Sequence, residues 1–227
     1  PWREYNRQGK LTLSGEYEHG DRVGVWRGYY PEGQLQYQGQ FNANGGEEGE
    51  WVTYHQGNQI ESRGVYTKGL REGLWLWWGE SGSLQQVGRF ESIKEQSKPE
   101  AKEAKDSDPL ADIGDKPVAQ AKERRVGLWL SWHDNCQIRT SGRYETGKRE
   151  GKWRWWKRDG SGWRSEQYLK SRAQKKLLPP ALITPQDQKR LGSLCETFTP
   201  QAKVKQSHLQ TALELAPAEA IVKAQTP

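Results

Sequence analysis

The sequence predicts a mainly β protein, an elongated array of about six antiparallel β-hairpins in a single twisted layer, with a short α-helical C-terminal tail. The first observation is a tryptophan that returns at intervals of 24 or 25 residues on both sides of one longer gap, which is the period of a repeat array. The second is the alternation of apolar and polar residues within each interval, which is the period of a strand with one buried face. The repeated tryptophans are Trp2, Trp26, Trp51, Trp75, Trp129 and Trp153.

Each repeat is expected to form one hairpin. Residues 24–41 read GVWRGYYPEGQLQYQGQF, and residues 49–66 repeat the same pattern as GEWVTYHQGNQIESRGVY. Turn-forming residues, such as those at 31–34, separate two short strands in each unit. In five of the six units Gly follows the tryptophan by 13 residues. A turn centred on 31–34 sets Trp26 opposite Gly39, and we expect the indole to lie on the bare backbone of that glycine.

The alternation divides the aromatic residues between two faces of the sheet. The repeated tryptophans lie on one face, where we also expect the Leu or Ile and the Tyr or Phe positions of each unit. A second aromatic residue follows each tryptophan by three positions and therefore lies on the opposite face. Large aromatic residues that recur on such a face are typical of protein interfaces, and the alternative is that stacking within the sheet or the C-terminal tail covers them. The residues predicted to bind a protein partner are Tyr29, Tyr54, Trp78, Trp132 and Trp156.

Two changes of composition set the expected boundaries. The repeat domain is expected at residues 1–168, interrupted at 92–125 by a polar insertion without aromatic residues. Residues 169–227 are expected to form a basic helical tail, because Thr-Pro pairs at 184–185 and 199–200 are typical of helix starts. This tail either folds back on one face of the sheet or docks on another molecule, since an amphipathic helix needs a surface on which to bury its apolar side.

The repeated pattern G-x-W-x-x-Y-x-x-x-G-x-L-x-x-x-G-x-Y-x-x-G resembles the MORN-repeat variant found in bacterial proteins, many of which are grouped with toxin–antitoxin or effector–immunity systems. The resemblance covers residues 2–168. It implies a β-hairpin array that binds a partner and has no catalytic residues. The sixth unit departs from the pattern, with Gly162 in place of Leu and Glu166 in place of Gly, as a terminal repeat would.

The function that this resemblance implies is that of an immunity or antitoxin protein, which binds and inhibits a cognate toxic effector enzyme such as a secreted lipase-type effector. The alternative is a structural or membrane-proximal scaffold that binds anionic lipid head groups through the tail. We expect a periplasmic or envelope-associated location more than a cytoplasmic one, with a signal or anchor before Pro1, because the sequence contains no Met. The basic residues of the tail that would contact lipid are Lys175, Lys176, Lys189 and Arg190.

No catalytic, cofactor or metal site is predicted. The formal net charge is +6, and most of it lies on the tail, so the sheet lacks the basic readout surface of a nucleic-acid-binding protein. Cys136 and Cys195 are the only cysteines. They form either a disulfide between the tail and the fifth repeat or two independent thiols, and without a C-x-x-C spacing they do not indicate zinc. His133 lies close to Cys136, but the two belong to a hairpin turn without the elements of a catalytic pair.

Overall fold

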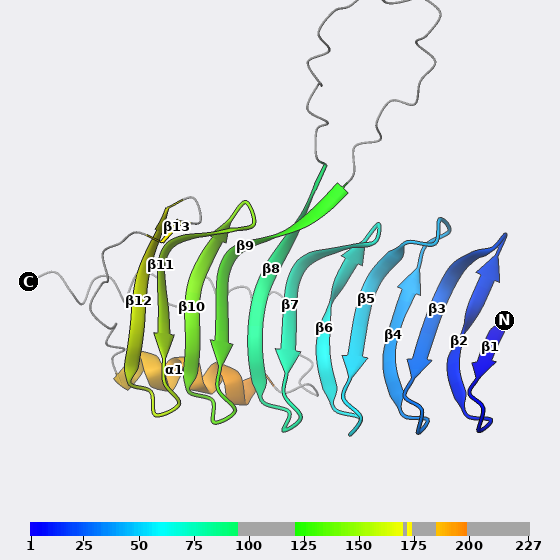
Figure 1. Ribbon diagram of the computed structural model, residues 1–227, viewed down its shortest axis with the longest axis horizontal. Helices are drawn as coiled ribbons and strands as arrows, with labels where there is room; N and C mark the ends of the chain where they lie inside the picture. Colours follow the sequence, from blue (N-terminus) through cyan, green and yellow to red (C-terminus); the bar gives the residue numbers. More distant parts are fainter. Residues whose placement is uncertain (95–120, 170–171, 174–184, 199–227) are drawn as a thin grey trace, which may run out of the picture.

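The computed structural model describes residues 1–94, 121–169, 172–173 and 185–198. The described strands form one 13-stranded sheet in which each strand pairs with its neighbours in the sequence. Figure 1 shows them side by side in chain order, so the predicted antiparallel hairpin array is confirmed. The strands are β1 (Trp2–Tyr5), β2 (Leu11–Glu18), β3 (Asp21–Tyr29), β4 (Leu35–Phe41), β5 (Glu47–Tyr54), β6 (Ile60–Thr67), β7 (Leu70–Trp78), β8 (Leu84–Lys94), β9 (Ala121–Trp132), β10 (Ile138–Glu145), β11 (Lys148–Trp156), β12 (Gly162–Leu169) and β13 (Arg172–Ala173), and the described helix is α1 (Pro185–Thr197).

The repeated tryptophan of each hairpin pairs with the residue predicted for it. Trp26 pairs with Gly39 across β3 and β4, and Trp153 pairs with Glu166 across β11 and β12. The constant spacing of 13 residues therefore reflects the register of the hairpins. The other pairs are Trp2 with Gly15, Trp51 with Gly64, Trp75 with Gly88 and Trp129 with Gly142.

Three junctions between hairpins are two-residue turns. At the first junction Glu18 pairs with Asp21, and the two residues between them, His19 and Gly20, have φ values of 51° and 94°. Two successive positive φ values are the mark of a type I′ turn, whose twist matches that of the flanking strands. The same turn recurs at Lys68 with Gly69 and at Thr146 with Gly147.

From the second hairpin onward, each repeated indole lies on the glycine of the hairpin before it. A Cβ added to Gly39 would lie 2.0 Å from the ring of Trp51, although the strand partner of Gly39 is Trp26. The expectation that Trp26 covers Gly39 is therefore wrong. Between β4 and β5 the pairing passes from Gln38 with Val52 to Gln40 with Glu48, so residues 49–51 of β5 bulge opposite Gly39. The indole of Trp51, in this bulge, folds over the glycine. The other glycines covered in this way are Gly15 under Trp26, Gly64 under Trp75, Gly88 under Trp129 and Gly142 under Trp153.

The repeated indoles and the Tyr or Phe positions form a continuous aromatic ladder on one face of the sheet. Tyr17 meets Trp26 edge to face with ring centroids 5.0 Å apart, and Trp26 meets Phe41 in the same way at 6.2 Å. The guanidinium of Arg22 lies 4.6 Å from the centroid of Trp26. Such aromatic pairs stabilise by about 0.5–1.5 kcal/mol beyond the burial of their area, so the ladder supports the sheet along its length. Its members are Trp2, Tyr17, Trp26, Phe41, Trp51, Tyr66, Trp75, Phe90, Trp129, Tyr144, Trp153 and Tyr168.

The Leu or Ile that follows the hairpin turn lies on the face opposite the ladder, which corrects the sequence prediction. Leu84 and Ile138 belong to a buried cluster with Trp78 and Trp132. The register of β7 and β8 shifts between Trp77 and Trp78, and Trp78 then pairs with Leu84. Strict alternation assigned the wrong face because this extra residue in β8 turns the side chains beyond it to the other side.

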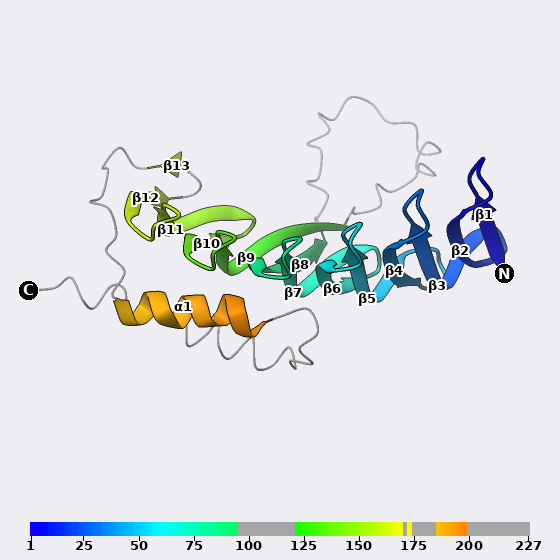
Figure 2. The same ribbon diagram turned by 90° about the horizontal axis from the view of Figure 1, so that it is seen from below.

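Helix α1 covers this second face along the C-terminal half of the sheet (Figure 2). It begins at Pro185, as the first Thr-Pro pair predicts, and it buries Leu191 and Cys195 against the sheet together with Phe198, which follows the helix. The tail therefore folds back on the sheet, which is one of the two alternatives that the sequence left open. The helix predicted after the second Thr-Pro pair, at 199–200, lies outside the described residues.

Strands β8 and β9 extend beyond their neighbours. Their pairing continues past Phe90 and Arg125 as far as Lys94 and Ala121. The two ends of the insertion predicted at 92–125 are therefore strands of the sheet, and the remainder of the insertion lies outside the described residues.

Candidate functional site

Three of the five aromatic residues predicted to bind a partner are core residues instead. Trp78, Trp132 and Trp156 are 5%, 2% and 2% exposed, and they lie in the buried cluster that includes residues of α1. The interpretation of these three as an exposed stripe is wrong because the chain's own tail covers them. Tyr29 and Tyr54, at the ends of β3 and β5, are half-buried.

Two of the buried indoles bind the backbone of the tail. Trp78 Nε1 donates a hydrogen bond to the carbonyl oxygen of Phe198 at 2.6 Å, and Trp132 Nε1 donates one to the carbonyl oxygen of Leu191 at 2.9 Å. A buried indole N–H needs an acceptor, and the tail supplies it here. A disulfide between Cys136 and Cys195 joins the turn of the fifth hairpin to α1.

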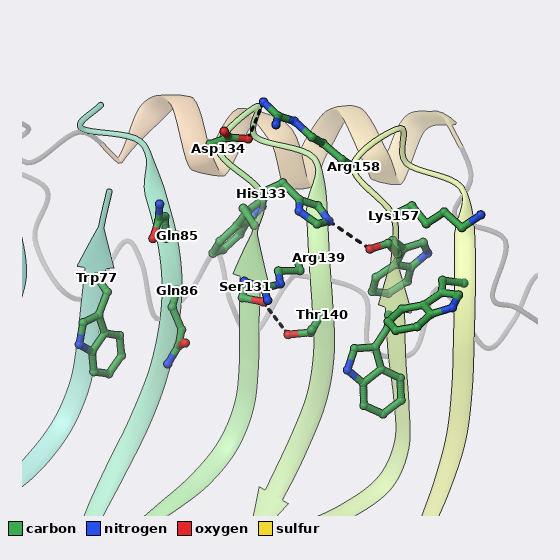
Figure 3. Close-up of a pocket in the computed structure, with 14 residues that line it drawn as sticks. Trp77, Gln85, Gln86, Ser131, His133, Asp134, Arg139, Thr140, Lys157 and Arg158 are labelled. Carbon is green, nitrogen blue, oxygen red and sulfur yellow. Dashed lines mark hydrogen bonds and ion pairs between the residues drawn. The ribbon is translucent and has the colours of Figure 1, made fainter. Parts of the chain in front are cut away.

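A hollow of about 1300 Å³ lies on the ladder face, on the side away from α1 (Figure 3). Two indoles form its walls, and the ladder holds both in place. Trp77 packs against Trp75 and Trp129 with ring centroids 6.0 and 5.9 Å apart, and Trp155 packs against Trp153 at 6.1 Å. We call this hollow the groove, and its principal lining residues are Trp77, Gln86, Ser131, Thr140, Trp155 and Trp163.

Two small hydroxyl residues form the floor between the walls. Ser131 and Thr140 are strand partners, and their hydroxyl oxygens are 2.6 Å apart (Figure 3). The position two residues after the repeated tryptophan is Trp77 in the fourth hairpin, Ser131 in the fifth and Trp155 in the sixth. The groove therefore arises because a short side chain occupies this position between two long ones.

Bulges aim two further side chains at the groove. Arg139 lies in the register shift between Ile138 and Thr140, and Trp163 occupies the equivalent place in the sixth hairpin. Both side chains are exposed, and that of Trp163 is 59% exposed. A bulge redirects the side chain of its extra residue, and both redirected side chains line the groove.

The turns at the end of the groove are braced by hydrogen bonds and one ion pair (Figure 3). His133 Nε2 lies 3.1 Å from the carbonyl oxygen of Trp156, and Arg158 forms an ion pair with Asp134 at 3.0 Å. His55 makes the equivalent contact in the third hairpin, with Trp78. His133 is thus a structural element of the repeat, and the neighbouring Cys136 is held in the disulfide rather than available as a nucleophile.

The glutamate of the sixth hairpin has a structural role. Glu166 stands where other hairpins carry the glycine, and it is 6% exposed. Tyr168 Oη donates a hydrogen bond to Glu166 Oε2 at 2.6 Å, and Arg164 forms an ion pair with the same carboxylate. The hydrogen bond from Tyr168 and the charge of Arg164 hold the pKa of Glu166 below its usual value.

The model of the family described as MORN repeat variant matches residues 22–43. This segment contains Trp26, Gly39 and Phe41, which carry the strand pairing and the ladder contacts described above. The chain carries MORN repeats. The other hairpins of the MORN array share the strand register of the matched one, and all but the sixth share its packing of an indole on the glycine. No curated protein matches the chain in sequence.

Sequence reasoning missed the groove of the MORN array. The prediction followed the aromatic residue three positions after each repeated tryptophan, whereas Trp77 and Trp155 follow it by two. The signal was present in the runs WLWW and WRWW at residues 75–78 and 153–156, which no other repeat contains. Such a run places indoles on both faces of a strand, and only one of the two faces is covered by α1.

Among residues 1–94, 121–169, 172–173 and 185–198, no group of three His, Cys, Asp or Glu side chains is placed to hold a metal ion. Helix α1, the helix that the structure describes, lacks the length and apolar character needed to cross a bilayer.

Proposed function

We propose that the chain is a non-catalytic protein-binding module and that the groove is its recognition surface. The observation that carries this proposal is the arrangement of Trp77, Trp155 and Trp163 around a hydroxyl floor on one sheet, with two of these indoles packed on the ladder. Aromatic side chains held in place before binding are the usual anchors of protein interfaces, because little conformational entropy is lost when they are covered. Polar groups between them supply orientation.

The proposed partner is a toxic effector enzyme, which the chain would bind and inhibit as an immunity or antitoxin protein. This part of the proposal rests on the resemblance of the repeats to those of bacterial toxin–antitoxin and effector–immunity proteins. A secreted lipase-type effector is the example that the resemblance suggests. Such an inhibitor acts by occupying the substrate entrance of the enzyme, a task for which a preformed groove and its rim are suited.

The proposal places the chain in an oxidising compartment, the periplasm or cell envelope. The supporting observation is the disulfide between Cys136 and Cys195, because disulfides persist in such compartments and are reduced in the cytosol. Trapping of free thiols in freshly lysed host cells tests this location, since a cytosolic chain would carry both cysteines in the labelled, reduced form.

Binding of anionic lipid through the tail remains the alternative. It receives less support, because the apolar side of α1 packs on the sheet and is not available to a bilayer. Lys189 of α1 is exposed, whereas Lys175 and Lys176 lie outside the described residues. Flotation with vesicles containing anionic lipid, compared with neutral vesicles, distinguishes this alternative from protein binding.

Capture of a partner with matched tryptophan variants tests the proposed function. The full chain and its Trp163→Ala and Trp2→Ala variants are used as bait in host lysate, and a retained enzyme is then purified and assayed with and without the chain. Both substitutions remove an exposed indole, 59% exposed for Trp163 and 49% for Trp2, but only Trp163 lines the groove. The proposal requires an enzyme that the wild-type chain and the Trp2→Ala chain inhibit with equal potency. The Trp163→Ala chain should inhibit it with at least tenfold lower potency. Equal inhibition by both variants contradicts it.

A further inference from the structure

The groove is lined by more positive than negative charge. Its lining contains the cationic side chains of Arg139, Lys157 and Arg158 and the carboxylate of Asp134. Arg158 is already paired with Asp134. Arg139 and Lys157 are exposed, and neither has an ion-pair partner among the residues that the structure describes. Two cations at the groove are therefore available to a ligand.

The dimensions of the groove suit a polypeptide segment. Its volume of about 1300 Å³ exceeds the roughly 300–1,000 Å³ of clefts that hold small molecules. It crosses the strands from β7 to β12, a distance of about 24 Å at about 4.8 Å per strand. An extended peptide of about seven residues covers that distance at about 3.3 Å per residue.

The floor offers hydrogen bonds to a peptide backbone. Ser131 and Thr140 together carry two hydroxyl hydrogens, and the bond between them uses one. The second hydrogen and the remaining lone pairs belong to two side chains that line the groove together with Gln86. An extended peptide presents N–H and C=O groups that such donors and acceptors can satisfy.

We propose that the groove binds an extended acidic segment of the partner protein, with carboxylates on Arg139 and Lys157 and an apolar side chain of the segment among Trp77, Trp155 and Trp163. The charge of the groove and its aromatic walls together carry this assignment. It rests on the proposed function, because it names the part of the partner that the recognition surface holds. Carboxylates bound to Arg or Lys make charge-assisted hydrogen bonds, which are about twice as strong as neutral ones.

A nucleic acid is a poorer fit to the same surface. A strand that crosses the groove would bring several phosphates, whereas two unpaired cations are available and Asp134 adds a negative charge at the rim. An acidic oligosaccharide shares the carboxylate chemistry, and it is included in the test as a competing outcome.

Selection of peptides on the full, folded chain tests the proposal. A library of random 10-residue peptides is displayed, selected on the wild-type chain, and the enriched sequences are synthesised for affinity measurement. One variant carries Arg139→Gln and Lys157→Gln. The matched control carries Arg7→Gln and Lys148→Gln, which removes the same net charge at exposed positions away from the groove.

The expected result is enrichment of peptides in which Asp or Glu residues and an apolar residue are spaced two or four positions apart, because alternate side chains of an extended peptide face the same side. Their Kd is expected to rise by about tenfold or more in the Arg139→Gln and Lys157→Gln chain, and by less than about twofold in the control chain. The rise should shrink as the salt concentration increases, because the contacts are exposed. Circular dichroism checks that both variant chains are folded.

Three outcomes overturn the proposal. The first is enrichment of neutral or basic peptides. The second is acidic peptides that bind both variants equally. The third is binding of an acidic oligosaccharide array in the absence of any peptide binding. The Trp163→Ala chain distinguishes failure of the acidic-segment proposal from failure of the proposed function. If neutral peptides bind and lose affinity in Trp163→Ala, the groove remains a protein-binding surface and only the acidic chemistry is wrong. If Trp163→Ala changes no protein or peptide binding, the recognition surface itself is wrong.

Discussion

The indole of Trp51 lies on the backbone of Gly39, a residue of the preceding hairpin, so closely that a Cβ at Gly39 would stand 2.0 Å from the ring. The hairpin partner of Gly39 is a different tryptophan, Trp26. Each glycine of this kind thus serves two hairpins at once, through strand pairing in its own hairpin and through ring packing with the next. The packing of one hairpin therefore continues across the junction into the next.

Gly64→Ala should destabilise the chain by about 1–3 kcal/mol or more, because the new methyl group would lie 2.1 Å from the ring of Trp75 and the junction would have to open. Gly57→Ala in the same hairpin is the matched control, since its Cβ would meet only the flexible side chain of Gln59 at 3.1 Å. Urea unfolding followed by tryptophan fluorescence measures both. Equal losses of stability in the two variants would show that ring packing on Gly64 is not what excludes a side chain.

Trp132→Ala should lower the free energy of unfolding by about 3–5 kcal/mol, which is usual for a buried tryptophan. The indole is 2% exposed, and its N–H bond to Leu191 holds α1 on the sheet. Trp163→Ala should change stability by less than about 0.5 kcal/mol, because that indole is at the surface. Thermal unfolding of the two variants distinguishes a core residue from a binding residue, and a stable Trp132→Ala chain would contradict the assignment of Trp132 to the core.

Reduction of the disulfide should destabilise the chain by about 2–4 kcal/mol, since Cys136 and Cys195 are separated by 59 residues and the bridge restricts the unfolded chain. It should also loosen α1, so that acrylamide quenches the fluorescence of buried indoles more strongly. The variant with Cys136→Ser and Cys195→Ser is the control, because it should already show the reduced behaviour and respond no further to dithiothreitol. No change in the unfolding midpoint of the wild-type chain on reduction would contradict this prediction.

The carboxylate of Glu166 should make stability depend on pH in the acid range. Its pKa in the folded chain is lowered, first by the hydrogen bond from Tyr168 and then by Arg164, so the folded state favours the charged form. The stabilisation is present above the usual pKa of a glutamate and is lost as the pH falls through the lower, folded value. The acid limb of a stability–pH profile should therefore be shallower in Glu166→Gln than in the wild type. Parallel acid limbs would show that Glu166 does not contribute.

The hairpin register was predictable from the sequence. The face of the sheet on which each side chain lies was only partly predictable. The partner of Trp26 depends on where the turn is centred, and the residues at 31–34 mark that centre. The side of the sheet on which Leu84 lies depends on a bulge, and the sequence pattern of alternation contains no sign of it. A single inserted residue reverses every side chain beyond it, so an error of one position becomes an error of face.

The candidate site was harder to predict than the fold. Which aromatic stripe remains accessible depends on where α1 docks, and the amphipathic pattern of a helix shows that it needs a surface without showing which one. Trp78 and Trp132 met the expectation for interface residues until the position of α1 was known. The groove also requires that Ser131 be short where Trp77 and Trp155 are long. This difference is seen only when the same position is compared between repeats.

An array in which each glycine fits the indole of the next hairpin can change its length without any new packing. Tandem duplication or loss of one whole period of 24 or 25 residues, begun at any point between Trp26 and Gly64, joins one intact glycine to one intact tryptophan. The proposed recognition surface is not tied to this constraint. The groove depends on the residue two positions after each of three tryptophans, so point substitutions can reshape it while the scaffold grows or shrinks by whole repeats.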